Sequence, residues 1–269
     1  MNSRPTVRSS RNSAKSLERG RESFQSHSWR NAFSQLAAAD REVPLGPEDL
    51  VQLAQAALLI GKETEGADFL ARAHQAFLSS GQVEHAARCA FWLGFTALLS
   101  GESAKAGGWF SRASRLVESD DCVEKGYLLL PAGYRAFHAG EADTAYSMFA
   151  QAAAVGERFR DKDLMTLGLQ GQGRVLIRAG EVTKGVALLD EAMVAVTAGE
   201  ISPLNAGGVY CSVLEACGEI FDLRRAQEWT LELEKWCASQ PDIVPYRGHC
   251  LVRRAELCLL YTSPSPRDS

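Results

Sequence analysis

The sequence predicts an all-α fold built from stacked helical hairpins. Four segments share one pattern, and their first glycines, Gly61, Gly101, Gly140 and Gly180, stand 40, 39 and 40 residues apart. Around these glycines apolar residues recur at intervals of three and four, which is the period of a helix face. No segment shows the strict alternation of apolar and polar residues that is typical of a half-buried strand. A repeat of this length predicts units that bury their apolar faces by stacking on one another.

Each repeat also carries small and large residues at fixed distances from its turn glycine. Small residues stand seven before it and five after it: Ala54, Gly94, Gly133 and Gly173, then Gly66, Ala106, Ala145 and Gly185. A large apolar residue and then an alanine follow: Leu70, Phe110, Phe149 and Leu189, then Ala73, Ala113, Ala152 and Ala192. We expect the glycine to end the first helix of a hairpin and the small residues to let the two helices approach closely.

The outer segments fit this pattern less well. Residues 1–13 are rich in serine and arginine and are predicted to be disordered. In the first hairpin His27 replaces the turn glycine, and in the last complete one Phe221 departs from the pattern. Another first helix is expected near Pro245. The prediction is therefore a repeat domain over residues 14–257 with about six hairpins, the last of them truncated.

Composition excludes several classes of protein. Hydrophobic residues make up 46% and charged residues 23% of the chain, which are ordinary values for a globular protein. The net charge of −4 argues against a nucleic-acid-binding surface, which is normally basic. No apolar run is long enough to cross a membrane, and the basic N-terminus lacks the apolar stretch of a signal peptide. We therefore expect a cytoplasmic protein without a membrane partner.

The residue types that carry catalysis or bind metals do not form a recognisable motif. The cysteines are spread along the chain without a CxxC pair: Cys89, Cys122, Cys211, Cys217, Cys237, Cys250 and Cys258. The histidines are equally scattered: His27, His74, His85, His138 and His249. Because a thiolate metal site needs clustered ligands, both sets are interpreted as packing or surface residues. No catalytic, cofactor-binding or metal-binding residue is predicted, and the fragment is not expected to be an enzyme.

Two glycine-containing stretches resemble phosphate-binding loops but lack features that such loops require. Gly168, Gly171 and Gly173 fall inside a predicted helix, whereas a dinucleotide loop follows a strand. In Ile60–Thr64 the lysine is followed by Glu63, and the earlier glycine of a Walker motif is missing. Arg158–Asp163 is expected to be a solvated connector. Arg224 and Arg225 are expected on an outer face, with a partner contact as the alternative.

The five tryptophans are interpreted mainly as packing residues. The alternative is that one of them lines a binding groove. They are Trp29, Trp92, Trp109, Trp229 and Trp236.

The spacing of the repeat residues resembles the tetratricopeptide repeat, with its small residue, glycine, alanine, large apolar residue and alanine. The second and third repeats match almost throughout. Their matching residues are Gly94, Gly101, Ala106, Phe110 and Ala113, then Gly133, Gly140, Ala145, Phe149 and Ala152. The resemblance implies an all-α, tetratricopeptide-like helical-hairpin solenoid. Such a solenoid would take a protein or peptide partner on its concave face, or would self-associate.

Longer stretches, such as RDKDLMTLGLQGQGRVLIRAGE at 160–181 and SQPDIVPYRGHCLVRRAEL at 239–257, resemble long LuxR-type regulators of bacteria. The likeness runs from about Leu17 to Leu257. It implies a repeat region that senses or recruits a partner, followed by a helix-turn-helix domain that binds DNA. We expect that domain to be missing, so DNA would be bound only through the absent part. The alternative is an interaction scaffold, or the partner-binding arm of a signalling enzyme, without DNA binding.

The last residues resemble nothing before them. CLLYTSPSPRD, at Cys258–Asp268, resembles the translation of a transposase adapter used in library preparation, and the alternative is a genuine Ser/Pro-rich tail. Residues 258–269 are therefore predicted to be an artefactual tail.

Overall fold

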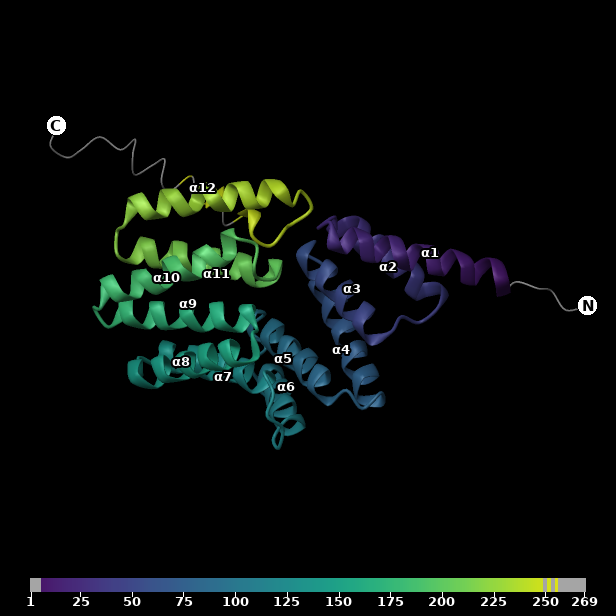
Figure 1. The fold of residues 1–269 in the computed structure, drawn as a ribbon, viewed down its shortest axis with the longest axis horizontal. Coiled ribbons are helices and arrows are strands. Elements are labelled where there is room, and N and C mark those ends of the chain that lie inside the picture. The colour runs from purple at the N-terminus through teal and green to yellow at the C-terminus, as the bar shows by residue number, and fades with distance from the viewer. Residues whose placement is uncertain (1–5, 249–250, 253–254, 256–269) are drawn as a thin grey trace, which may run out of the picture. The chain divides into compact units, whose positions relative to one another are not determined.

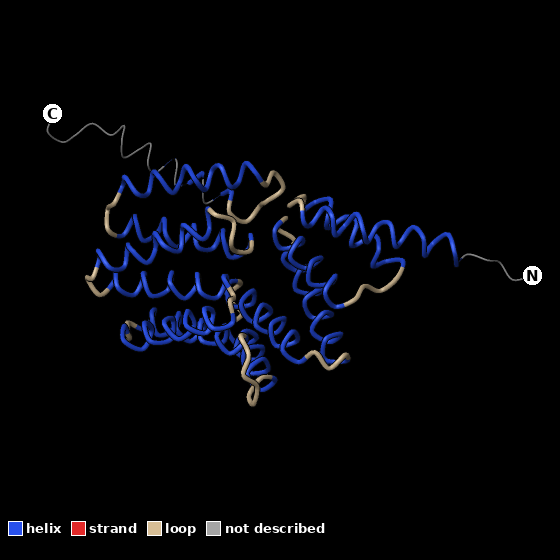
Figure 2. The backbone as a smooth tube through the Cα atoms, viewed as in Figure 1, coloured by secondary structure: helices blue, strands red, loops and turns tan. Residues whose placement is uncertain are grey.

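The structure, a computed structural model, describes residues 6–248, 251–252 and 255. Within these residues every regular element is a helix, and no strand occurs (Figure 1, Figure 2). The predicted all-α class is therefore confirmed. None of the described helices is both long enough and apolar enough to cross a lipid bilayer.

The chain forms two compact units. Unit 1 takes in the described residues up to Leu128 together with Gln240–Val244, and unit 2 takes in Leu129–Ser239 and the described residues from Pro245. The helices of unit 1 are α1 (Thr6–Gln25), α2 (Trp29–Glu42), α3 (Pro47–Leu59), α4 (Glu63–Ser79), α5 (Val83–Leu99) and α6 (Ser103–Leu116). Those of unit 2 are α8 (Ala142–Phe159), α9 (Lys162–Arg178), α10 (Val182–Thr197), α11 (Pro203–Glu219) and α12 (Leu223–Ser239). Helix α7 (Glu124–Ala139) contains the boundary between them.

Consecutive helices pack as antiparallel pairs, and the small residues of the repeat stand where the pairs touch. A Cβ atom placed on Gly94 of α5 would lie 2.6 Å from the Phe110 ring of α6. A Cβ on Gly20 of α1 would lie 2.7 Å from Leu36 of α2 in the same way. Real Cβ atoms do not come so close, so larger residues there would push the helices apart. The predicted close approach within hairpins is confirmed.

The turn between the two helices of a hairpin requires a left-handed backbone. The repeat glycines Gly61, Gly101, Gly140 and Gly180 have φ between 77° and 88°. His27 and Phe221 occupy the corresponding positions with φ of 57° and 56°, so these outer hairpins keep the same turn without its glycine. An L-residue in this conformation is strained by contact between its Cβ and the backbone.

Replacing Phe221 with glycine should raise the free energy of unfolding by about 1 kcal/mol, because it relieves that strain. The side chain is 84% exposed, so little packing is lost. Gly101→Ala is the converse control: its φ is 78° and no atom lies within 4 Å of the new Cβ, so it should destabilise by a similar amount through backbone strain alone. Urea unfolding measures both. Destabilisation by Phe221→Gly would contradict the prediction.

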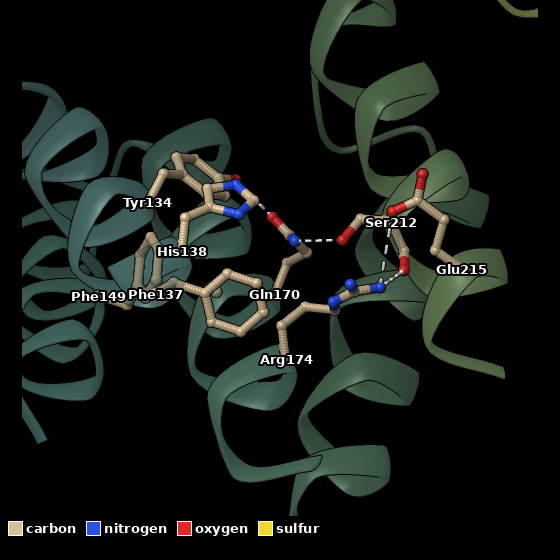
Figure 3. Close-up of a pocket in the computed structure, with 9 residues that line it drawn as sticks. Tyr134, Phe137, His138, Phe149, Gln170, Arg174, Ser212 and Glu215 are labelled. Atoms are coloured by element: carbon tan, nitrogen blue, oxygen red, sulfur yellow. Dashed lines mark hydrogen bonds and ion pairs between the residues drawn. The ribbon is translucent and has the colours of Figure 1, made fainter. Parts of the chain in front are cut away.

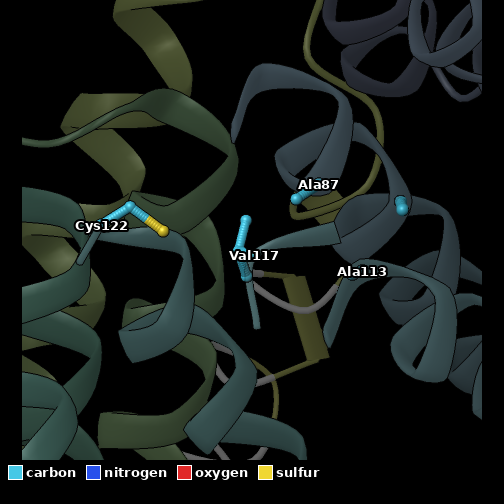
Figure 4. Close-up of a cluster of buried hydrophobic side chains, with 5 residues drawn as sticks. Ala87, Ala113, Val117 and Cys122 are labelled. Carbon is cyan, nitrogen blue, oxygen red and sulfur yellow. The ribbon is translucent and has the colours of Figure 1, made fainter. Parts of the chain in front are cut away.

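Unit 1 has a small apolar core between α5, α6 and the start of α7. It contains Ala87, Ala90, Ala113, Val117 and Cys122 (Figure 4). Trp109, Leu116 and Leu128 pack against this cluster. Alanine dominates because the helices approach closely here, so core stability depends on the fit of small side chains.

His74 of α4 is buried beside this region. Its Nδ1–H donates a hydrogen bond of 2.8 Å to the Ala86 carbonyl, and its Nε2 is buried without a partner. Burial lowers the pKa of His74, since the imidazolium would lose its hydration. The unfolded chain therefore binds a proton more readily than the folded chain.

Stability should accordingly fall as the pH drops below about 6.5, the ordinary histidine pKa, with a slope of at most about 1.4 kcal/mol per pH unit for this one group. His74→Phe, which cannot be protonated, should remove that part of the slope. Urea unfolding between pH 7.5 and pH 5 tests this. An equal slope in the variant and the parent would contradict it.

The N-terminal prediction differs from the structure in part. Helix α1 begins at Thr6, inside the segment 1–13 that composition assigned to disorder. At the end of that segment the buried Ser13 hydroxyl donates to the Ala39 carbonyl, so packing against α2 supports the helix there. Residues 1–5 and the predicted adapter tail, 258–269, lie outside the described residues.

Candidate functional site

A pocket lined by both polar and aromatic side chains lies in unit 2 between the first helices of three successive hairpins, α7, α9 and α11 (Figure 3). Its lining residues are Tyr134, Phe137, His138, Phe149, Gln170, Gly171, Arg174, Ser212 and Glu215. Helix α8 contributes only Phe149. The side chains that come from different first helices are 32 (His138 to Gln170) to 81 (Tyr134 to Glu215) residues apart in the chain, and the stacking of hairpins brings them together.

A chain of hydrogen bonds crosses the pocket. The Tyr134 hydroxyl donates to Oε1 of Gln170 over 2.9 Å, and Nε2 of Gln170 donates to the Ser212 hydroxyl (Figure 3). Gln170 is only 3% exposed, so both halves of its amide find partners inside the protein, as a buried amide requires. Burial raises the pKa of Tyr134 to about 12, which keeps this hydroxyl a proton donor at neutral pH.

Arg174 stands one helical turn further along α9, on the same face as Gln170. Its guanidinium donates to the Ser212 carbonyl over 2.9 Å and to Glu219 over 2.8 Å. Glu215 lies 3.7 Å away and completes the ion pairs. Because both carboxylates are about half exposed, a ligand could exchange with one of them for the buried cation.

Aromatic rings form the other wall of the pocket. Phe149 and Tyr134 meet edge to face with their ring centroids 5.1 Å apart. The Phe137 ring lies under two cations, with the Arg174 and Arg178 guanidinium carbons 5.8 Å and 4.6 Å from its centroid. A Cβ on Gly171 would clash with Phe149, so glycine at this position lets the ring sit against α9. The pocket thus combines an apolar wall with fixed donors and acceptors.

This arrangement of side chains is suited to binding a polar ligand. An amide, two hydroxyls and an arginine can exchange hydrogen bonds with the main chain and the polar side chains of a ligand. His138 is the ionisable ring at the rim, and the exposed carboxylate of Glu215 faces Arg174. Sequence reasoning did not single out Gln170, Arg174 or Ser212. The signal for Gln170 and Arg174 was their spacing of four, which places two polar side chains on one face of a helix, and Ser212 carried no signal of its own.

The glycines of α9 lie where the sequence placed them, inside a helix. Gly168 packs against Ala153, since a Cβ added to this glycine would lie only 2.6 Å from the Ala153 nitrogen. Gly173 packs against α10, where the Gly185 carbonyl oxygen would be 2.8 Å from such a Cβ. The role of these glycines is therefore close helix packing, which agrees with the rejection of a nucleotide loop.

The other singled-out residues do not converge. His27 stacks on Trp29 and His85 on Phe77, far along the chain from the pocket-lining His138. In the described part of the chain, no three His, Cys, Asp or Glu side chains gather as metal ligands. Cys250, Cys258 and His249 lie outside the described residues.

The described cysteines are mostly buried. Burial raises the pKa of the Cys89 thiol to about 12 and that of Cys217 to about 11, which suppresses the reactive thiolate. The described cysteines are Cys89, Cys122, Cys211, Cys217 and Cys237. Their placement fits the interpretation as apolar packing residues.

One expectation about charged residues needs correction. Arg225 does not project from an outer face: its guanidinium forms a bidentate pair with Asp190 of α10, at 3.0 and 3.1 Å, and also binds Asp222. Arg224 is exposed, as expected. The connector at 158–163 is mostly exposed, as expected, and within it Asp161 caps α9 by accepting from the Leu164 amide over 2.9 Å.

The sequence left open whether the tryptophans serve in packing or line a groove, and the structure shows examples of both placements. Trp29 is fully buried, and Trp236 packs between Tyr210 and Tyr246. Trp109 lines a shallow depression on α6 together with Lys105, Gly108 and Arg112.

Comparisons with known proteins place this fold. A Rap protein in complex with Competence and Sporulation Factor is similar with a TM-score of 0.57 and 12% identity, over 90% of this chain and 75% of that one. BtubC from P. vanneervenii gives 0.46 with 16% identity, over 75% and 95% of the two chains. The TPR2AB domain of yeast Sti1, in complex with pHSP90, gives 0.36 with 13% identity, over 93% and 96%. No family model and no curated protein matches the chain.

The fold defines the class: this is an all-α protein with a tetratricopeptide-like helical-hairpin solenoid fold, as the repeat spacing predicts. At 12% identity the likeness to the Rap protein concerns the fold.

Proposed function

We propose that this chain is a binding protein for a peptide or a protein segment, and that the pocket between α7, α9 and α11 is its binding site. The observation that carries the proposal is the meeting of Tyr134, Gln170 and Ser212 with the buried Arg174 on the first helices of three hairpins. The Rap protein of similar fold was solved with a bound factor, which supports a binding role. We propose binding, and not catalysis, as the activity of this chain.

An extended peptide suits the chemistry of the pocket. Its main chain offers a donor and an acceptor per residue, which match the amide of Gln170 and the hydroxyls beside it. A carboxylate on the peptide could replace Glu215 or Glu219 at Arg174. An apolar side chain could lie against Phe137. The ligand class expected is therefore a peptide with an acidic and an apolar residue.

Selection from a phage-displayed library of random dodecapeptides tests this proposal. Peptides enriched on the parent chain should bind it with micromolar affinity in fluorescence anisotropy. Gln170→Leu and Arg174→Met should each weaken binding at least about tenfold, because each leaves buried or ligand polar groups unpaired. Lys184→Ala, on the exposed face of α10, is the matched control and should leave affinity unchanged.

Circular dichroism and urea unfolding must show that the pocket variants fold, since Gln170 also joins helices within unit 2. If the enriched peptides bind the folded pocket variants as tightly as they bind the parent chain, the proposed binding site is wrong. A selection that yields no peptide above background would overturn the function.

We further propose that this peptide-binding region belongs to a LuxR-type transcriptional regulator, whose DNA contacts are made by a separate helix-turn-helix domain. The stretches at 160–181 and 239–257 support it, together with a net charge of −4 that is unfavourable for DNA binding. The chain itself should show only weak, salt-sensitive association with promoter DNA. Nanomolar, sequence-dependent binding would contradict this division of labour.

Reading the source DNA past Leu257 separates this proposal from its alternative, a scaffold or the arm of a signalling enzyme. A helix-turn-helix sequence supports the regulator, and a stop codon or a catalytic domain supports the alternative. The same read tests the proposal that Cys258–Asp268 translate adapter DNA.

A further inference from the structure

Five residues of unit 1 come from a distant part of the chain. Gln240–Val244 follow α12 in the sequence, yet they pack within unit 1 as a non-helical segment. Gln240 is 2% exposed and Ile243 is 1% exposed, while Pro241 and Val244 remain exposed. The two buried side chains are three residues apart because the Ile243 amide donates to the Gln240 carbonyl over 3.1 Å and closes a turn at Pro241 and Asp242. The segment therefore enters unit 1 as a turn with a buried side chain at each end.

The first half of the segment binds the N-terminal end of α2. The indole N–H of Trp29 donates to the Gln240 side-chain oxygen over 3.1 Å, and the Arg30 amide donates to Asp242 over 3.2 Å. The Arg30 guanidinium lies 3.3 Å from the same carboxylate. The N-cap residue of this helix, Ser28, makes no capping bond with its own side chain. Asp242 therefore takes the place of a cap, where a helix N-terminus favours negative charge.

The second half binds the C-terminal end of α3. The Val244 amide donates to the Leu59 carbonyl over 2.9 Å, and this carbonyl belongs to the last turn, where intrahelical donors are lacking. The Val244 side chain comes within 3.0 Å of the position that a Cβ of Gly61 would take. The turn glycine of this hairpin thus also leaves room for the segment.

We propose that the start of α2 and the end of α3 form a second peptide-binding site, and that Gln240–Val244 is its internal ligand. The partner that the site fits is a peptide with an amide, an acid and then two β-branched residues, in the order Gln-Pro-Asp-Ile-Val. Such a peptide competes with the internal segment. This competition regulates the site. The apparent affinity for an external peptide equals the intrinsic affinity multiplied by the fraction of molecules in which the segment has left.

The contacts favour exchange over a permanent structural role. The Val244 anchor is a single hydrogen bond to a helix end. The Asp242 anchor combines one hydrogen bond with an ion pair to Arg30, whose side chain is 69% exposed. Ion pairs this exposed contribute little stability. The buried Gln240 and Ile243 side chains supply the specificity, because each needs a shaped cavity and Gln240 needs the indole donor. This proposal involves residues of unit 1 and does not depend on the pocket in unit 2.

The experiment uses the full chain and a fluorescent peptide with the sequence of Ser239–Pro245, SQPDIVP. In the double variant Gln240→Ala/Asp242→Ala, the internal ligand loses its two polar side chains. Fluorescence anisotropy should then show that this variant binds the peptide at least about tenfold more tightly than the parent, whose site is filled. A peptide with asparagine in place of its aspartate should bind the double variant at least about tenfold more weakly.

Matched variants identify the site. Asp68→Asn, which removes a charge from an exposed position of α4, should leave peptide binding as in the parent. Lys184→Ala, on the exposed face of α10 and made in the double variant, should not change binding, so the effect is not a general response to substitution in unit 2. Trp29→Phe, made in the double variant, should abolish most binding because it removes the donor to the glutamine.

Hydrogen exchange of the parent gives a second measurement. The Val244 amide should exchange at least about tenfold faster than amides in the middle of α3, since the segment opens locally. Equal protection of the two would overturn the proposal and make the segment an integral part of the core. A double variant that is folded by circular dichroism but binds no more peptide than the parent would overturn it, and so would a double variant that fails to fold.

Discussion

Replacing Phe149 with alanine should lower the free energy of unfolding by about 3–5 kcal/mol. The ring is 1% exposed and packs between the backbones of two helices, where Gly133 and Gly171 present no side chain. Those glycines cannot fill the space left by the ring, so a cavity should remain. The cost should therefore lie in the upper part of the range for large-to-small core substitutions.

Urea unfolding with a constant m-value measures the effect of Phe149→Ala. Tyr146→Ala on the same helix is the control: its side chain is 37% exposed, and it should cost well under half as much. A loss of less than about 1.5 kcal/mol at Phe149 would mean that the hairpins relax around the cavity, and would contradict the close packing of α7, α8 and α9. Peptide binding should also fall, since Phe149 lines the pocket.

The second large effect is expected at Ala106. This side chain is 1% exposed at the contact of α5 and α6, so Ala106→Leu should overpack the hairpin and destabilise it by about 1–3 kcal/mol. Its neighbour Gly107 supplies a control, because no atom lies within 4 Å of a Cβ placed there. Gly107→Ala should stabilise the chain by about 0.5–1 kcal/mol, as alanine is favoured over glycine inside a helix.

Opposite signs at adjacent positions would establish the rotational register of α6. Urea unfolding of the two single variants is sufficient. If Ala106→Leu falls within about 0.5 kcal/mol of the parent, the predicted register of the repeat is wrong.

The hairpins themselves could be predicted because their signals are local. A helix advances about 100° per residue, so a face shows itself as a spacing of three and four in the sequence. The turn glycines and the small residues, such as Gly94 and Ala106, stand at fixed distances from one another, and the structure keeps those distances. The departures at His27 and Phe221 were visible too, but whether the turn survives them was not. Their left-handed backbone, stabilised by the hairpin around it, shows that packing overrides the local preference.

The pocket in unit 2 could not be predicted from the sequence, because a single repeat does not contain the residues that meet there. Gln170 and Arg174 could be recognised as polar residues inside a buried helix, but their partners Tyr134, Ser212 and Glu219 lie in other hairpins. Which of them meet is decided by the stacking of one hairpin on the next, where a shift of one residue turns a side chain through about 100°.

The packing of Gln240–Val244 against unit 1 was even less predictable from the sequence, since two of its hydrogen bonds join residues 211 and 212 positions apart. By itself, the sequence determined the all-α class, the hairpin register and the close-packed positions, because these follow from helix periodicity and from glycine. Only the tertiary structure decided which polar groups converge and which helix ends are capped from a distance. Those pairings arise when separately predictable helices are packed together, and buried polar groups must then find partners wherever the chain provides them.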